Sequence, residues 1–360
     1  MRVVIAPDCF TGTLSAAVAA DAVAEGWHRT RPHDELVLRP MSDGGPGFLD
    51  VLPGRLMSVL VEDPLARPAL ASFRLDGSTA WVESAMACGL HLLDPADRDP
   101  ALTTTYGVGQ LVRAAVDAGA QRAVIGLGGS GTNDGGAGFL AALGVRREGA
   151  DGEPLAPGCL PLAQAVRLTG TPLAVELVAA TDVDNPLLGV HGATRVFAEQ
   201  KGGRDLEALE AALAHWADLL EQHLGRSARE LPGAGAAGGL GFAILAAGGT
   251  RISGFSVVAA AVGLAEALAG ADLVITGEGS FDWQSLRGKV VSGVAAAAAQ
   301  EAVPCVVLAG RTSVGRREAA AAGIEASYSL VDEVGLERAL NDPAESLAAA
   351  ASTLARGWGM

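Results

Sequence analysis

Residues 2–8 read Arg2-Val-Val-Ile-Ala-Pro-Asp8, a short apolar run that ends in a proline and an acid. We expect a strand over 2–6 and then a helix over 15–30, because the Ser15 hydroxyl can accept hydrogen bonds from first-turn amides. Runs of Val, Ile and Leu continue to alternate with Ala-rich stretches along most of the chain. This alternation predicts an α/β protein with a parallel sheet.

The two ends of the chain share this pattern. Further strands are expected at 35–39, 271–276, 303–308 and 326–330, with helices at 288–300 and 316–322. In the middle we expect strands at 122–127 and 174–180, a helix at 206–225 and a loop at 148–158. At roughly 150 residues per domain, 360 residues favour two domains. We predict that residues 1–66 and 283–360 form one discontinuous α/β domain, with residues 67–282 inserted as the second.

The charge balance argues against a nucleic-acid partner. Lys and Arg total 26 against 41 Asp and Glu, a formal net charge of −15, whereas phosphate backbones require a basic surface. Aromatic residues at 4% leave few platforms for base stacking. With 49% hydrophobic residues the chain can bury a large core, so a small-molecule substrate is the remaining expectation.

The cysteines and the apolar segments indicate a cytoplasmic protein. Four cysteines lie far apart without a CxxC pair, as expected of free thiols in a reducing compartment. Residues 232–250 carry no charge but are mostly Gly and Ala, which favours buried helix packing over a membrane span. No membrane partner is expected, and a monomer and a homodimer are both compatible with the sequence.

Acidic residues follow the predicted strands with unusual regularity. They are Asp8, Asp43, Asp134, Asp182 and Glu278, with Asp282 shortly after the last. Ligands of parallel α/β sheets bind beyond the carboxyl ends of the strands, so these acids can converge on one site. A cluster of carboxylates requires a cation, and oxygen ligands suit Mg²⁺.

Glycine loops accompany these acids. The longest, Gly126-Leu-Gly-Gly-Ser-Gly-Thr-Asn-Asp-Gly-Gly136, runs into a predicted helix, and amides in such loops bind phosphate or carboxylate oxygens. Only two of the basic residues are lysines, Lys201 and Lys289, which suggests positions where a compact ammonium is needed.

Two G-x-G-x-x-G patterns raise the alternative of a dinucleotide-binding dehydrogenase. The first, at Gly126, Gly128 and Gly131, follows a strand. A second strand ending in an acid about twenty residues later is required, but that region reads Val145-Arg-Arg-Glu-Gly149 without a recognisable strand before it. We therefore rank the dehydrogenase low, and the P-loop pattern G-x-x-x-x-G-K-[ST] is absent.

The order of the motifs resembles the type-1 glycerate kinases over nearly the whole chain. The resemblance is carried by Ile5-Ala-Pro-Asp-Cys-Phe-Thr-Gly-Thr-Leu-Ser15, Met41-Ser-Asp-Gly-Gly45, Asp63-Pro-Leu-Ala-Arg-Pro68, Thr104-Thr-Tyr-Gly-Val-Gly109, and the segments 126–136, 180–189, 200–202, 235–241 and 276–289. It implies ATP-dependent phosphorylation of a D-glycerate hydroxyl. It also implies a flavodoxin-like parallel-sheet domain and a restriction-endonuclease-like mixed-sheet domain, with an active-site cleft between them.

Within that resemblance we assign roles as hypotheses. Lys289 neutralises the transferring phosphoryl group, Asp182 and Glu278 hold Mg²⁺ with help from Asn185, and either Asp282 or Asp8 accepts the substrate proton. The predicted contacts of phosphate or substrate carboxylate are Gly128, Gly129, Ser130, Thr132, Asn133 and Asp134, with Asp43 and Lys201 as further candidates.

The chain departs from the family pattern at a few positions. Thr11 and Ser280 stand where the family usually has cations, Pro46 replaces Glu and Cys9 replaces Ser, while Arg287 is a candidate for compensation. Each lost charge-assisted contact is worth roughly 1.5–3 kcal/mol. A kinase of another small hydroxy acid and a catalytically inactive nucleotide-binding paralogue are therefore the alternatives.

Overall fold

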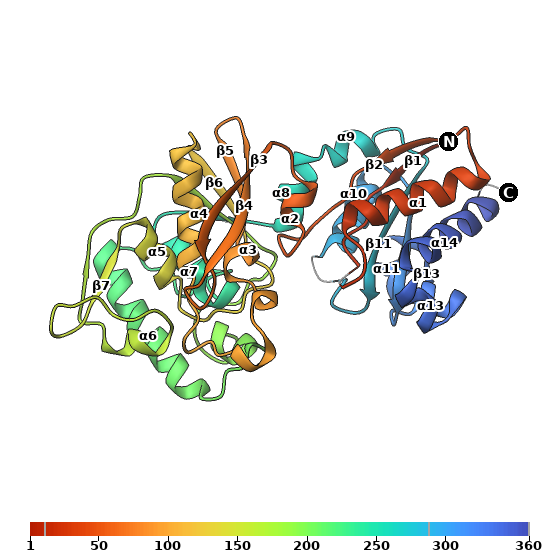
Figure 1. Cartoon of the computed structure of the whole chain (residues 1–360). Coiled ribbons are helices and arrows are strands. Elements are labelled where there is room, and N and C mark those ends of the chain that lie inside the picture. The colour runs from red at the N-terminus through yellow and green to blue at the C-terminus, as the bar shows by residue number, and fades with distance from the viewer. Residues whose placement is uncertain (11, 287–288, 359–360) are drawn as a thin grey trace. The chain divides into compact units, whose positions relative to one another are not determined.

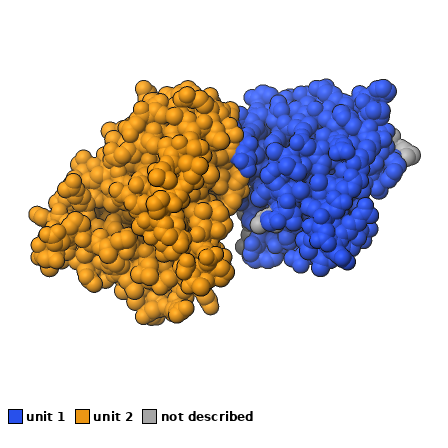
Figure 2. Space-filling view, in the orientation of Figure 1, with its two compact units in different colours: residues 1–43, 50–52, 255–360 blue, residues 44–49, 53–254 orange. Residues whose placement is uncertain are grey.

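The computed structural model describes residues 1–10, 12–286 and 289–358, so Thr11 and Arg287 lie outside the described residues. The chain divides into two compact units, coloured separately in Figure 2. Unit 1 comprises residues 1–43, 50–52 and 255–360, and unit 2 comprises residues 44–49 and 53–254. Two short helices, α2 (Phe48–Val51) and α8 (Gly254–Ala261), each contain one of the points where the chain passes from one unit to the other, and the remaining two points lie just before and just after α2.

Unit 1 is built on a five-stranded sheet in which all neighbouring strands are parallel. In spatial order the strands are β13 (Ile324–Ser329), β12 (Cys305–Thr312), β11 (Leu273–Phe281), β1 (Arg2–Ile5) and β2 (Glu35–Leu38). Numbered along the chain within this unit, the order is 2-1-3-4-5, which is that of the flavodoxin-like fold. The order reverses between β1 and β11, and such a switch point is where ligands of these sheets bind.

Helices α1 (Ala16–Thr30) and α14 (Pro343–Gly357) lie side by side in unit 1 (Figure 1). The Ser15 side chain accepts a hydrogen bond from Val18 N at 3.3 Å, so the predicted helix start is confirmed. Their apolar faces share one core with alternate residues of β1, β11 and β12, including the fully buried Trp27. The unit also contains α9 (Leu264–Leu268), α10 (Val290–Gln300), α11 (Arg316–Ala321), α12 (Leu330–Val334) and α13 (Leu336–Asn341).

Strand β11 extends five residues past the predicted end at 276. It continues because β12 runs alongside it to the end and pairs with it at Glu278↔Ala309 and Ser280↔Arg311. Glu278 therefore lies inside a strand rather than in the loop that follows one. The extension holds Glu278 on hydrogen-bonded backbone.

Unit 2 contains a six-stranded mixed sheet, so the predicted fold class, a parallel sheet and a mixed sheet in an α/β protein, is confirmed. Its order is β10 (Thr250–Ile252), β9 (Glu176–Ala180), β6 (Arg122–Gly126), β5 (Thr79–Glu83), β4 (Pro68–Asp76) and β3 (Arg55–Glu62). Pairs β3–β4 and β4–β5 are antiparallel, and the others are parallel. A separate antiparallel pair joins β7 (Arg146–Glu148) to β8 (Arg167–Thr169).

The pair β7–β8 corrects one detail of the sequence analysis. A strand does precede Gly149, but it pairs outside the main sheet, so the second strand of a dinucleotide-binding unit is still missing there.

The longer helices of unit 2 are α4 (Tyr106–Asp117), α6 (Leu206–Leu224) and α7 (Ala236–Ala246), with α3 (Ala85–Cys88) and α5 (Ala137–Leu143) shorter. Single turns are at Leu90–Leu92, Pro95–Asp97, Leu160–Gln164, Thr194–Ala198 and Glu199–Lys201. Every residue of α7 is buried, as expected of a Gly/Ala-packed helix.

In the part of the chain that the structure describes, no helix combines the length and apolar character needed to cross a membrane.

The unit boundaries fall at other residues than the predicted 66/67 and 282/283. Residues 53–66 belong to unit 2 because β3 pairs with β4, and residues 255–282 belong to unit 1 because β11 pairs with β1. Pairing between strands distant in the sequence decides both cases, and composition does not reveal such pairing.

Close packing of α1 against α14 predicts that Gly26→Ala is destabilising. A Cβ at Gly26 would lie 2.0 Å from the Ala348 carbonyl oxygen, so the helices must separate. We expect a loss of about 1–3 kcal/mol in the free energy of unfolding. Gly357→Ala in α14 is the control, because a Cβ there meets nothing within 4 Å. Thermal and urea unfolding measure both, and equal stability of the two variants would contradict the packing argument.

Candidate active site

Three carboxylates gather near the switch point of the unit 1 sheet. Asp8 follows β1, Asp43 follows β2, and Glu278 lies in β11. The Asp8 N–H donates to the Gly277 carbonyl at 2.8 Å, which fixes the end of β1 beside β11. The Asp8 Oδ1 accepts a hydrogen bond from Cys9 N at 2.7 Å. Of the five acids predicted to converge, these three lie close enough to interact electrostatically.

This environment disfavours the ionised forms of two of the acids. Burial, followed by repulsion from Asp43 and Glu278, raises the pKa of Asp8 to about 7. Burial also raises the pKa of Glu278 to about 7, with repulsion from Asp282 and Asp43 adding to it. The Ser285 hydroxyl and the Lys289 ammonium favour the Glu278 anion but do not outweigh burial. The two carboxyls therefore titrate near neutral pH.

The donor set fits a divalent cation that also takes ligands from a bound molecule. Glu278 is 8% exposed, and its Oε1 has no hydrogen-bond partner among the described residues. Within those same residues, no group of three or more His, Cys, Asp or Glu side chains is arranged to hold a metal ion by itself. Mg²⁺ commonly takes one or two carboxylates and completes its shell with water and phosphate oxygens. The carboxylates of unit 1 match that partial shell.

Lys289 stands beside this cluster, at the N-cap of α10. Its positive charge acts on Glu278, and its backbone carbonyl accepts a hydrogen bond from Gly293 N at 2.9 Å, which anchors the first turn. Lys289 is partly exposed, so its ammonium can reach a ligand.

Asp282 and Ser285 form a tight turn after β11. The Asp282 N–H donates to Ser285 Oγ at 3.1 Å, and Asp282 Oδ1 accepts from Gln284 N at 2.8 Å. Part of the acceptor capacity of Asp282 is thus used inside the turn, whereas Asp8 has a pKa near neutrality. Sequence reasoning missed Ser285. Its signal is the spacing Asp282-Trp-Gln-Ser285, in which two polar side chains can each accept a hydrogen bond from a backbone N–H of the same turn.

Two glycine loops of unit 2 pack on each other. Gly128 N donates to the Gly44 carbonyl at 3.0 Å, and a Cβ at Gly128 would lie 2.4 Å from Gly45 Cα. Gly44 has φ +92°, and a Cβ there would lie 2.7 Å from the Ala180 carbonyl oxygen. These close contacts explain why positions 44 and 128 are occupied by glycine. They also leave the 128–130 segment facing a cavity.

Asp134 holds the end of the long glycine loop. It is 1% exposed, and its Oδ2 accepts hydrogen bonds from Thr105 N at 2.9 Å and Gly138 N at 3.0 Å. The Thr105 hydroxyl and Gly136 N donate to the same carboxylate. Although we predicted a phosphate or carboxylate contact, this geometry makes Asp134 a positioning residue for the loop and α5.

Neighbouring loop residues are also buried. Asn133 Nδ2 donates to Thr194 Oγ1 at 3.1 Å, while its Oδ1 has no partner in the described part of the chain. Thr132 is fully buried, and its backbone carbonyl rather than its hydroxyl contacts Lys201. Of the six predicted loop contacts, Gly128, Gly129 and Ser130 line the cavity.

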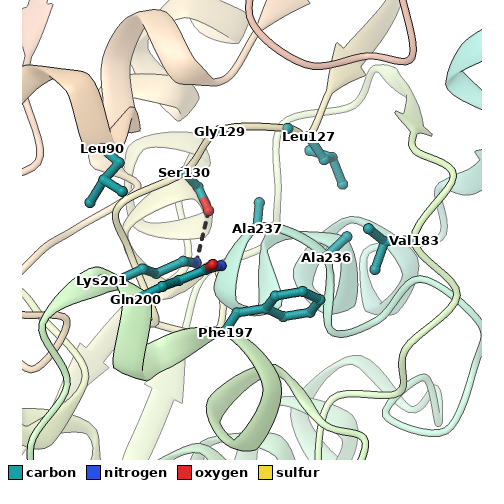
Figure 3. A pocket seen from close by; sticks show the side chains of 11 residues that line it. Leu90, Leu127, Gly129, Ser130, Val183, Phe197, Gln200, Lys201, Ala236 and Ala237 are labelled. Carbon is teal, nitrogen blue, oxygen red and sulfur yellow. Dashed lines mark hydrogen bonds between the residues drawn. The ribbon is translucent and has the colours of Figure 1, made fainter. Parts of the chain in front are cut away.

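Lys201 closes this cavity from the opposite side (Figure 3). Its Nζ donates to Ser130 Oγ at 2.9 Å and to the Thr132 carbonyl at 2.8 Å. The cavity has a volume of about 270 Å³, and Phe197 and Gln200 are lining residues that the sequence analysis missed. The sequence hints at Gln200 as a site residue only through its position next to Lys201, in the segment 200–202 that carries part of the family resemblance.

The Lys201 ammonium is buried without a counter-ion. The residue is 4% exposed and forms no ion pair with a carboxylate of the described residues. Burial lowers the pKa of Lys201 to about 8, and the charges of Cys88 and Asp134 oppose this shift only in part. Since an ammonium has three N–H donors and two are used, one remains for an anion in the cavity.

Asp182 and Asn185 lie after β9 in the same unit. Asp182 is partly buried, and Asn185 Nδ2 donates to the His191 carbonyl at 2.7 Å. The main-chain carbonyl of Asn185 accepts from Gly235 N at 2.9 Å, so this segment is tied to the start of α7. Their assignment to Mg²⁺ stays a prediction.

Comparison with known proteins identifies the family of this chain. A sequence model of the glycerate kinase family matches residues 3–359. The chain is 41% identical to a glycerate kinase of Bacillus subtilis over 99% of this chain and 97% of that protein. It is 36% identical to a glycerate 2-kinase of Escherichia coli, with the same shares covered. A crystal structure described as a glycerate kinase 2 of Salmonella typhimurium superimposes with a TM-score of 0.86 at 37% identity, covering 99% of this chain and 97% of that one. The chain therefore belongs to the glycerate kinase family and is a kinase.

Proposed function

We propose that the protein transfers the γ-phosphoryl group of ATP, bound with Mg²⁺, to a hydroxyl of D-glycerate. One observation carries the proposal within the family: two carboxyls with pKa values near 7, Asp8 and Glu278, lie beside Lys289 at the switch point of a parallel sheet. Phosphoryl transfer depends on positioning and charge neutralisation, and these residues supply both.

The roles follow from the contacts. Glu278 would hold the cation, directly or through water, with its Oε1, which has no hydrogen-bond partner among the described residues. When bound, Mg²⁺ neutralises charge on the phosphate oxygens. Lys289 neutralises the transferring group. Asp8 is favoured over Asp282 as the acceptor of the substrate proton, because a general base works best with a pKa near the operating pH.

The Lys201 cavity is proposed to bind the substrate carboxylate. A volume of about 270 Å³ suits a three-carbon acid better than a nucleoside triphosphate. Lys201 and Ser130 are the polar groups that face an anion there, and apolar side chains such as Phe197 exclude water. The assignments of Asp43, Asp182 and Asn185 remain proposals from the sequence.

Lys289→Ala is expected to lower kcat by about 10²–10³, as is typical when one transition-state charge contact is removed. An assay that couples ADP formation to D-glycerate measures this loss. Arg317→Ala, an exposed cation on α11, is the matched control and should retain wild-type turnover. Absence of D-glycerate-dependent ADP formation in the wild type would reject the proposed reaction, and phosphorus NMR of the product identifies the hydroxyl.

Binding of D-glycerate is expected to weaken as the pH rises through about 8. The ammonium of Lys201 is the form that binds an anion, and above its pKa the neutral amine predominates. The value of kcat/KM for D-glycerate should then fall by up to about tenfold per pH unit. Lys201→Met should raise KM for D-glycerate at pH 7, and the fall of kcat/KM above pH 8 should disappear in this variant. An unchanged fall of kcat/KM in Lys201→Met would show that another group titrates.

Glu278→Gln is expected to stabilise the metal-free protein at pH 8. The folded-state pKa of about 7 exceeds the ordinary 4.5, so the folded state binds more protons between these values and stability falls as pH rises through them. The Gln variant cannot ionise, so it does not lose stability in this way. Each gain of about 1 kcal/mol in the free energy of unfolding corresponds to a Tm rise of about 2–4 °C. Below about pH 4 the gain should vanish.

Thermal unfolding at several pH values, with and without MgADP, measures this effect. The wild type should gain stability from MgADP and Glu278→Gln should gain less. Glu325→Gln on the exposed face of β13 is the control. A lower Tm for Glu278→Gln than for the wild type at pH 8 without Mg²⁺ would contradict the argument that burial of the Glu278 carboxylate destabilises the folded state.

A further inference from the structure

Unit 1 contains a cavity to which the proposed function has so far assigned no ligand. Its volume is about 320 Å³, and it lies where β11 and β12 end, at Gly279, Ser280, Gly310 and Arg311. Residues of α12, α13 and the start of α14 also line it, and Figure 1 shows α13 close to β13. Ligand pockets start at about this size.

The floor of the cavity is apolar and continuous with the core. Phe10 is 3% exposed, Leu330 1% and Ala339 7%, and all three belong to the core shared by α1 and α14. At the rim, Leu336 and Leu340 remain 59% and 56% exposed. These two exposed leucines and the apolar floor form a surface that an apolar part of a ligand could cover.

Three of the side chains that line this cavity are polar. Ser280 and Arg311 are paired across β11 and β12, and Thr13 also lines the cavity. Arg311 is exposed, and its side chain forms no hydrogen bond or ion pair with the described residues. An Arg in this position can bind phosphate or stack on an aromatic ring. The cavity therefore suits a molecule with an aromatic body and an anionic end.

The anionic end would point toward the carboxylate cluster. Gly279 directly follows Glu278 in β11, and Phe10 is two residues after Asp8. At about 3.3 Å per residue of strand, Ser280 lies about 7 Å along the chain from Glu278. A nucleoside in the cavity could thus extend a phosphate chain to the cation held by Glu278 without leaving unit 1.

We propose that this cavity binds the nucleoside of the phosphoryl donor, with the purine over Phe10 and between Leu336 and Leu340, and with Arg311 on the phosphates. The assignment rests on the proposed function, since it identifies where the ATP of that reaction is held. It makes Leu336, Leu340 and Arg311 donor-binding residues that the sequence did not single out.

Leu340→Glu tests the assignment. The side chain is more than half exposed, so the fold should tolerate the change, while a carboxylate at the rim repels phosphate and reduces apolar contact. Titration calorimetry with MgADP should show binding weakened by about tenfold or more. KM for ATP should rise by a similar factor, with KM for D-glycerate unchanged. Val18→Glu, a half-exposed apolar residue on α1 outside the cavity, is the matched control and should bind MgADP normally.

Magnesium pyrophosphate separates base binding from phosphate binding. Leu336→Glu, a second rim variant, should likewise weaken MgADP more than pyrophosphate, whereas Arg311→Gln should weaken both. Normal MgADP affinity in both rim variants would overturn the assignment while leaving the proposed reaction intact, and so would absence of MgADP binding to the wild type. Loss of MgADP affinity in the rim variants of a protein that does not turn over D-glycerate would support the nucleoside site and reject the proposed substrate.

Discussion

Burial of acidic side chains next to one another at the β1–β11 junction is the constraint from which the chemistry of unit 1 follows. Asp8, Asp43 and Glu278 are brought together by strands that pair in parallel, so the backbone hydrogen bonds prevent the side chains from separating. Burial then raises the pKa values of Asp8 and Glu278 to about 7. A divalent cation bound there would compensate the negative charges, and its binding would stabilise the folded state. The metal-free sheet edge is thus less stable than it could be, which is common at functional sites.

Unit 2 presents the opposite case, a buried ammonium that forms no ion pair within the described part of the chain. Lys201 gives two of its hydrogen bonds to the glycine loop, and the loop itself is held by Asp134 and by the contact with Gly44. Because the ammonium is desolvated, a small carboxylate in the cavity recovers more interaction energy than it would at the surface. Acidic groups suited to the metal and a basic group suited to the acid thus reside in different units of one chain. That division matches a reaction in which donor and acceptor are separate molecules.

The proposed nucleoside cavity extends the same reasoning to the donor. It shares its floor with the core of unit 1, so the Phe10, Leu330 and Ala339 side chains serve stability and shape together. Its rim is formed by α13, a six-residue helix whose leucines Leu336 and Leu340 are left exposed. The purine of the proposed nucleoside would cover these two leucines.

The alternation of apolar and Ala-rich segments determined the α/β class, the cap at Ser15 and most strands of unit 1, because periodicity and capping are local properties. The acids after the strands and the rarity of lysine likewise pointed to Asp8, Glu278, Lys289 and Lys201. Only the tertiary structure decided that β11 continues through Glu278, that Asp134 is buried within its own loop, and that β3 and β11 belong to units other than those predicted. It also revealed the cavity beside Phe10, whose lining comes from five separate segments. These features depend on strand pairing and burial between residues far apart in the chain, and no local pattern of residues encodes which distant partner a strand or a carboxylate meets.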